Sequence, residues 1–509
     1  MFRALRNLRR LARIGITLAR YDAVGGLDPL GTRAALALAA RLLRRHDLPP
    51  RPGQRLAAAL TALGPSFIKL GQALSTRADL VGEAVATDLS ALQDKLAPFP
   101  ADDALTTVAA EFGQPVAALF AEFDDVPVAA ASIAQVHFAR TADGAEVAVK
   151  ILRPGVEGLF ARDIDLFLWL AQLLERHVPR IRRLKPVAVV RSFEDTVKIE
   201  MDLRLEAAAA AELGQNFADD PDFRVPKVDW ARTSRRVLTT ARIAGISIDE
   251  RAAIAAAGFE PQAIVARAAR AFFNQVFRDG FFHADMHPGN LFVAPDGALV
   301  AVDFGIMGHI DEPTRHALAD MLMGFLAGDY ATVAEVHFRA GFVPATQSLG
   351  AFSQACRAIA EPILGKPLHE ISLARLLAQL FEVTEQFQME TQPQLLLLQK
   401  SMLVCEGVGR TLAPELNMWE LARPLIEEWM LQNRGPAARA RVATQEALAR
   451  IEALPAFVGN IEKAAAMLAS GGVRLHPESI AALSGGRRLA WWPWAIAVVA
   501  LAAVIAWLA

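Results

Sequence analysis

Three oxygen-bearing side chains offer the clearest chemistry in this sequence. Asp285 is followed five positions later by Asn290, and Asp303 opens an Asp-Phe-Gly triplet. Carboxylate and amide oxygens gathered around one point suit a hard cation such as Mg²⁺. If the fold brings these residues together, we expect a metal site.

A short hairpin is expected to bring them together. The apolar runs Leu291–Val293 and Ala298–Val302 favour strands. Between them, Pro295-Asp296-Gly297 has tight-turn chemistry, because glycine tolerates positive φ. The spacing is that of the catalytic and metal loops of protein kinases. There the asparagine and second aspartate hold metal, and the first aspartate accepts or orients a hydroxyl proton.

Two other interpretations of this stretch remain open. His283 and His287 are four positions apart and could share a zinc ion on a helix. Pro288-Gly289 argues against a helix there, and no glutamate follows His283 as a metalloprotease would require. The hairpin could also be purely structural.

A second hairpin carries a lysine. The segments Gln135–Arg140 and Glu146–Leu152 flank an Asp-Gly turn signal. Lys150 ends a Val-Ala-Val-Lys run, where kinases place the lysine that holds the α- and β-phosphates. The loop before it consists of Ala129, Ala130, Ala131 and Ser132. Alanine disfavours the positive φ of a glycine loop, so we expect altered nucleotide preference or phosphate geometry.

Acidic residues in a predicted helix could partner that lysine. Asp202 and Glu206 are four positions apart and would share a helix face, and one of them could pair with Lys150. Lys69 and Gln72, in an earlier helical stretch, also share a face. Taken alone, those two residues are typical of a solvated face.

Length and composition set broad limits. A chain of 509 residues exceeds one core, so two or more domains are expected. The net charge of −2 supplies no field that would attract nucleic acid. Two cysteines, Cys356 and Cys405, indicate no disulfide framework and fit a reducing compartment.

Both ends of the chain suggest a membrane. Residues 1–20 carry six arginines among apolar residues at helical spacing. Such a helix could lie on an anionic membrane or pack on the body of the protein. Residues 489–509 contain no charge, and as a helix they would span about 31 Å, close to the roughly 30 Å bilayer core. Tryptophans near both ends and the preceding Arg487-Arg488 predict a transmembrane anchor with the main body cytoplasmic.

The combined motifs resemble the UbiB/ADCK-type atypical kinase-like family, in its ubiquinone-biosynthesis branch. The resemblance rests on a Lys-x-Gly-Gln motif, an alanine-rich loop, a Glu-x-Asp motif and the two kinase loops. In this chain they are Lys69–Gln72, Ala129–Ser132, Glu200–Asp202, His283–Asn290 and Asp303–Gly305.

The resemblance implies a bilobal protein-kinase-like α+β fold with an N-terminal helical extension folded over the active site and a C-terminal transmembrane helix. We expect a basic amphipathic segment (1–50), the extension (51–118), an N-lobe (119–245), a C-lobe (246–430), a helical region (431–486) and the membrane anchor (487–509).

Site roles follow from the same resemblance. It implies Asp285, Lys150 and Glu206 as catalytic residues, with Glu206 as the partner of Lys150. It implies Asn290 and Asp303 as Mg²⁺ ligands. The implied nucleotide-binding residues are Ala129, Ala130, Ala131, Ser132, Lys150, Lys69, Gln72, Glu200 and Asp202.

The resemblance also implies function. We expect an ATP-dependent atypical kinase or ATPase at the inner membrane that binds ATP or ADP with Mg²⁺. It would support ubiquinone biosynthesis by acting on or presenting polyprenyl lipid intermediates, with other proteins of that pathway as partners. Ordinary protein phosphorylation and nucleic-acid binding are not expected. The alternatives are a small-molecule or lipid kinase and a nucleotide-switched membrane scaffold without catalysis.

Overall fold

The computed structural model separates into two compact units, Met1–Met430 and Leu431–Ala509. It describes residues 2–23, 45, 47–75, 81–90, 92, 96–178, 185–362, 379, 382–384, 386–389, 392–416 and 418–434. Of the second unit, only residues 431–434 are described, so the architecture below is that of the first unit.

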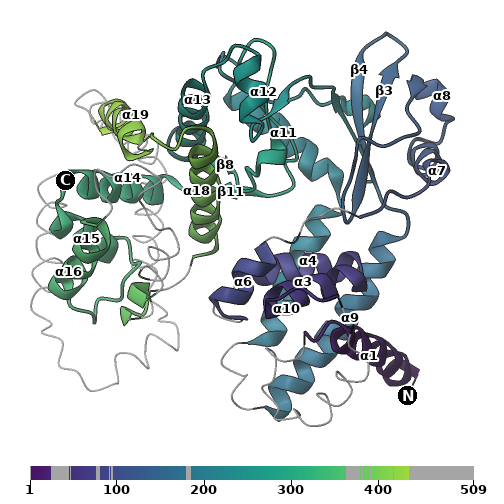
Figure 1. Ribbon diagram of the computed structural model, residues 1–509, viewed down its shortest axis with the longest axis horizontal. Helices are drawn as coiled ribbons and strands as arrows, with labels where there is room; N and C mark the ends of the chain where they lie inside the picture. Colours follow the sequence, from purple (N-terminus) through teal and green to yellow (C-terminus); the bar gives the residue numbers. More distant parts are fainter. Residues whose placement is uncertain are drawn as a thin grey trace, which may run out of the picture. The chain divides into compact units, whose positions relative to one another are not determined.

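An antiparallel sheet lies between residues 120 and 241 of this unit, with strand order β1-β3-β4-β6 and β2 beside β3. The strands are β1 (Phe120–Phe123), β2 (Ala129–Ala130), β3 (Ala134–Thr141), β4 (Glu146–Leu152) and β6 (Val237–Ala241). The predicted β3–β4 hairpin is confirmed, with Val136 opposite Lys150. Its turn contains Gly144 at φ 88°, a conformation that glycine adopts easily. Helices α7 (Ala101–Phe112) and α8 (Val116–Leu119) lie beside this sheet (Figure 1).

Three helices connect β4 to the rest of the chain: α9 (Val156–His177), α10 (Pro186–Glu200) and α11 (Leu203–Asn216). The prediction that Asp202 and Glu206 share a helix face was wrong. Helix α10 ends at Glu200, and Asp202 is the non-helical N-cap of α11, where its carboxylate accepts a hydrogen bond from the Arg204 amide. Aspartate is favoured at an N-cap because it satisfies an amide that has no partner within the helix.

The N-terminal region is mostly helical among its described residues, as expected. It contains α1 (Phe2–Arg20), α3 (Pro52–Leu63), α4 (Pro65–Ser75) and α6 (Glu83–Ser90). Gly71 lets α4 approach α3 closely, since a Cβ there would lie 2.7 Å from a methyl carbon of Leu60. On α1, Ile14 and Leu18 pack against the core, and Arg10 forms an ion pair with Asp163.

Of the two alternatives for the N-terminus, the structure therefore has α1 packed on the body of the protein. The opposite face is exposed and includes Arg13, Ile16 and Arg20. Membrane contact through that exposed face stays a prediction.

The second half of the unit is mostly helical around small sheets. The strands β5 (Phe223–Arg224), β10 (Leu299–Ala301), β9 (Leu291–Val293) and β7 (Ile246–Ser247) form one sheet in that order, and β8 (Phe281–His283) pairs with β11 (Met307–His309). The helices are α12 (Arg251–Ala256), α13 (Pro261–Phe273), α14 (Glu312–Ala327), α15 (Tyr330–Arg339), α16 (Leu349–Ala360), α18 (Pro393–Leu412) and α19 (Met418–Arg434).

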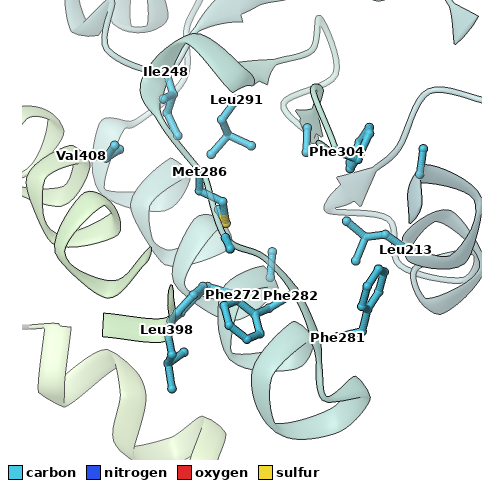
Figure 2. Close-up of a cluster of buried hydrophobic side chains, with 14 of the residues drawn as sticks. Leu213, Ile248, Phe272, Phe281, Phe282, Met286, Leu291, Phe304, Leu398 and Val408 are labelled. Atoms are coloured by element: carbon cyan, nitrogen blue, oxygen red, sulfur yellow. The ribbon is translucent and has the colours of Figure 1, made fainter. Parts of the chain in front are cut away.

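The predicted β9–β10 hairpin is confirmed. Val293 lies opposite Leu299, and Gly297 adopts φ 85° in the turn. The apolar core continues from this hairpin into the loop before it, where Met286 lies among Leu291, Phe272 and Phe282 (Figure 2). The polar loop at the start of the hairpin is therefore anchored in the apolar core through Met286.

Within the described part of the chain, no helix combines the length and the apolar character needed to cross a membrane. The predicted transmembrane anchor at 487–509 lies outside the described residues. So does the predicted helical region at 431–486, apart from residues 431–434 at the end of α19.

A buried polar network joins the N-terminal region to the sheet. The Gln135 side chain accepts a hydrogen bond from the Phe99 amide at 3.0 Å and donates one to the Phe99 carbonyl at 3.3 Å. The same amide nitrogen lies 2.8 Å from His137 Nε2. Because the Gln135 nitrogen donates, His137 Nε2 must accept, and Nδ1 donates to the Asp124 carbonyl at 2.7 Å. The network therefore requires a neutral imidazole.

Acidification should weaken the protein through His137. Burial lowers the pKa of His137 below 6.5, although the Asp124 carbonyl and nearby acids oppose this effect. The unfolded chain therefore binds the proton more readily than the folded protein does. The stabilising contribution is complete above the unfolded pKa and is lost as the pH falls below it. The thermal midpoint should fall further between about pH 7.5 and about pH 5.5 in wild type than in His137→Asn, which keeps a donor for Asp124.

His283 and His337 also have pKa values lowered by burial. Wild type and His137→Asn both contain these two histidines, so the difference between their losses of thermal stability reports on His137. The same loss of thermal stability in the two proteins would contradict the neutral-imidazole network.

Candidate nucleotide site

One lysine connects three elements of the fold. Lys150 projects from β4, and its Nζ lies 2.7 and 3.0 Å from the carboxylate oxygens of Glu206 on α11. The same nitrogen lies 3.0 Å from Oδ1 of Asp303, which follows β10. The Glu206 side chain is 8% exposed, whereas that of Asp303 is 50% exposed. Solvent or a ligand can therefore reach Asp303 but not Glu206.

The pKa values follow from this arrangement. Burial alone would lower the pKa of Lys150, but the charges of Asp303 and Glu206 raise it above its ordinary value. Burial raises the pKa of Glu206 to about 7, against the opposing effect of Lys150. For Asp303, burial would raise the pKa, but Lys150 and then Lys69 hold it below its ordinary range. Asp303 is thus an ionised carboxylate near neutral pH, ready to bind a cation.

Backbone geometry fixes where Asp303 points. Its φ is 62°, in the left-handed region, where a side chain usually costs about 1–2 kcal/mol. Such strain persists only where the surroundings enforce it, and it is concentrated at functional sites. The preceding residue supplies part of this constraint, because the Val302 amide donates to the Asn290 carbonyl at 2.9 Å.

Hydrogen bonds fold the Asp285 loop onto the same strand end. His283 is buried; its Nε2 lies 3.1 Å from the Val302 carbonyl, and its Nδ1 accepts from the Asp285 amide at 3.1 Å. Both ring nitrogens are therefore used in the loop. The zinc alternative is wrong for His283, because neither nitrogen remains for a metal.

Asn290 is oriented by the loop as well. Its side-chain nitrogen donates to the Asp285 carbonyl at 3.0 Å, which assigns the amide oxygen as the atom for a cation. The carboxylate of Asp285 has a partner on another helix. Its Oδ1 lies 2.8 Å from Nζ of Lys400 on α18. The expected grouping of the three oxygens around one cation stays a prediction.

This donor set suits Mg²⁺ on a nucleotide rather than a metal held by protein alone. Among the described residues, no group of three or more histidine, cysteine, aspartate or glutamate side chains could hold a metal ion. Mg²⁺ in nucleotide sites typically binds one or two carboxylates, with phosphates and water completing its shell. The half-exposed Asp303 carboxylate and the Asn290 amide oxygen meet that requirement.

The N-terminal extension reaches this site through Lys69. Its Nζ lies 3.0 Å from Glu200, and the two side chains are only 12% and 10% exposed. A solvated face is therefore wrong for Lys69, which also contributes to the low pKa of Asp303. Gln72 donates to the Leu92 carbonyl at 3.3 Å and so helps to hold the extension together. Asp202 forms an ion pair with Arg204 at 2.6 Å, and that contact directs its carboxylate along α11.

The alanine-rich loop is a tight strand turn. Ala129 and Ala130 form β2, opposite Val136 and Gln135, and the Ala131 amide donates to Ala134 at 2.7 Å. None of Ala129, Ala130, Ala131 and Ser132 has a positive φ, as expected for alanine in place of glycine. The Ser132 side chain is fully buried beneath the turn.

Sequence reasoning missed two cations at this site. Arg153 donates from one nitrogen to the Ala131 carbonyl at 3.2 Å and to the Ala97 carbonyl at 3.0 Å, which ties the alanine loop to the chain leaving the extension. Lys400 lies in an apolar stretch interpreted as core. The one charge in the apolar run Leu395–Cys405 was the available signal, because buried apolar segments seldom carry a lysine without a partner.

The fold and the site together define a protein-kinase-like domain. A model of the ABC1 atypical kinase-like domain matches residues 91–337, and a model of the UbiB helical domain matches residues 356–417. A Mycobacterium tuberculosis structure, Rv3197 in complex with erythromycin, shares 25% identity with a TM-score of 0.53, covering 77% of this chain and 98% of that one.

Curated relatives agree. A Marinobacter nauticus protein named "Probable protein kinase UbiB" is 42% identical over 441 residues, which cover 85% of this chain and 80% of the relative. A protein of the same name from Aliivibrio fischeri is 41% identical over 461 residues, covering 88% of this chain and 84% of the relative. The chain belongs to the ABC1 atypical kinase-like family, together with these UbiB proteins.

Replacing Asp303 by asparagine should weaken Mg²⁺-dependent nucleotide binding. Asparagine has a similar size and tolerates positive φ, so the variant removes the charge and leaves the backbone. We expect Mg²⁺-dependent affinity for ATP to fall about tenfold or more in Asp303→Asn, measured by fluorescent-nucleotide titration with and without Mg²⁺. Asp195→Asn, at a side chain that is 74% exposed on α10, is the matched control. Unchanged Mg-ATP affinity in Asp303→Asn would refute the metal assignment.

Proposed function

We propose that this chain is a membrane-attached, ATP-dependent atypical kinase or ATPase that supports ubiquinone biosynthesis. Its targets would be polyprenyl lipid intermediates, which it would act on or present to other proteins of that pathway. The observation that carries the ATP-dependent part is the contact of one lysine with a buried glutamate and a half-exposed aspartate. This is the charge arrangement that protein-kinase-like enzymes use around nucleotide phosphates. The lipid and pathway part rests on the family resemblance.

Each residue then has a role that its contacts support. Lys150, held by Glu206, would bind the α- and β-phosphates. Asp303 and the Asn290 amide oxygen would hold Mg²⁺, which neutralises charge on the phosphates when bound. Asp285 would accept or orient the proton of the attacking hydroxyl or water.

Two features argue against ordinary protein phosphorylation. The extension places Lys69 in a nearly buried ion pair with Glu200. The positive charge of Lys69 also lowers the pKa of Asp303. The alanine turn is pinned by backbone hydrogen bonds and by Arg153, so it lacks the freedom of a glycine loop to close over phosphates. We expect slow turnover and an acceptor smaller than a protein.

Phosphate release from Mg-ATP tests the proposal. Wild type should release phosphate only with Mg²⁺, and Asp285→Asn and Lys150→Met should each fall by about 100-fold or more. Lys198→Met is the control, because Lys198 is an exposed lysine on α10 paired with Glu194. The assay is run with and without a polyprenyl-phenol lipid, alongside a screen of phosphate acceptors. Equal release by wild type and both site variants would refute ATP hydrolysis at this site.

Membrane attachment is tested separately by truncation. A chain ending before Arg487 should move from the membrane fraction to the supernatant. Any remaining binding to anionic vesicles should fall in that truncated chain when Arg13→Gln and Arg20→Gln are added, since both arginines lie on the exposed face of α1. These substitutions keep the packed face of α1 intact. Full membrane retention by the truncated double variant would show that neither segment attaches the protein.

A further inference from the structure

Helix α18 is docked directly on the loop that carries Asp285. Ser401 is fully buried, and its hydroxyl lies 3.0 Å from the Leu397 carbonyl of its own helix and 3.4 Å from the His283 carbonyl. Leu398 packs near Phe272 and Phe282, in the cluster that also holds Met286 (Figure 2). These buried contacts set the register of α18 against the Asp285 loop.

That register delivers Lys400 to Asp285. Lys400 precedes the buried Ser401, and its Nζ lies 2.8 Å from Asp285 Oδ1. This is the length of a charge-assisted hydrogen bond, which is stronger than a neutral one. The side chains of Lys400 and Asp285 are 37% and 34% exposed, so solvent or a ligand can reach both of them.

We propose that Lys400 is a positioning residue for Asp285. By holding Oδ1, it fixes the carboxylate rotamer and leaves the second oxygen for the acceptor's proton. The proposal rests on the proposed function, in which the acceptor O–H gives its proton to Asp285. The acceptor oxygen then bonds to the γ-phosphorus, and ADP leaves with the electron pair of the broken P–O bond. Lys400 transfers no proton in this scheme.

The alternative is that Lys400 serves only to hold α18 in place. The contacts argue against this, because Ser401 and Leu398 already secure the helix within the core. A partly exposed ion pair adds little stability. The Lys400–Asp285 ion pair therefore contributes little to folding, but it fixes the direction of the Asp285 carboxylate.

The test compares steady-state phosphate release by the full chain for wild type, Lys400→Met, Lys400→Gln and Lys400→Arg. Methionine keeps the apolar stem and removes the charge, and glutamine provides a second neutral variant. We expect kcat to fall about 10- to 100-fold in both neutral variants, with KM for Mg-ATP changed less than about threefold. Arginine should recover most of the rate, because it can donate to the same oxygen. Lys198→Met, the exposed control on α10, should retain the wild-type rate.

Adding Lys400→Met to Asp285→Asn completes the comparison. If Lys400 acts through Asp285, the double variant should be no slower than Asp285→Asn alone. Wild-type kcat in Lys400→Met, a loss that arginine does not recover, or losses that add in the double variant would each overturn the proposal.

Hydrogen exchange separates this proposal from the proposed function. Backbone amides of residues 283–290 should exchange faster in Lys400→Met than in wild type or Lys198→Met, whether or not ATP is hydrolysed. If wild type releases no phosphate, the proposed function fails and the exchange result alone decides the positioning role. Unchanged exchange in that loop would then overturn it.

Discussion

The site depends on one ammonium group shared by two carboxylates. Glu206 and Asp303 come from separate elements and would repel each other without Lys150 between them. The two contacts are not equivalent, because Glu206 is buried and Asp303 is half exposed. An arriving cation can therefore replace Lys150 at Asp303 and leave the contact with Glu206 in place. Lys150 would keep its position while becoming available to phosphates.

The N-terminal extension adds a second lysine to this arrangement of charges. Lys69 brings a second ammonium within electrostatic reach of Asp303, and Glu200 holds that ammonium in an ion pair. Gly71, two residues later, allows α4 to pack closely against Leu60 and Leu92, which sets the position of Lys69. Packing in the extension and electrostatics in the kinase-like domain are thus linked through one short helix.

The sequence predicted the elements whose signals are local. Both hairpins were recognisable because alternating apolar runs and Asp-Gly or Pro-Asp-Gly turns specify strand pairing over a few residues. The choice of Glu206 rather than Asp202 as the partner of Lys150 needed the family resemblance, since nothing within the segment distinguishes the two acids.

Lys400 and Arg153 were missed for a different reason. Each acts across a long stretch of chain, and their partners are an acid in another loop and backbone carbonyls, which leave no pattern in sequence. The prediction that Asp202 and Glu206 share a helix face was wrong because it assumed one continuous helix. One helix ends before Asp202, and Asp202 caps the next. The family could be identified from the motifs, whereas the supporting contacts of the site required coordinates.

The left-handed backbone at Asp303 restricts which residues can replace this carboxylate. Most replacements at that position would add strain to the loss of the carboxylate, whereas asparagine and glycine accept the same φ. Both can arise from an aspartate codon by a single base change. A lineage that loses this carboxylate but keeps the fold would therefore be expected to pass through these two residues first. Such a descendant would still carry the loop shape of its ancestor.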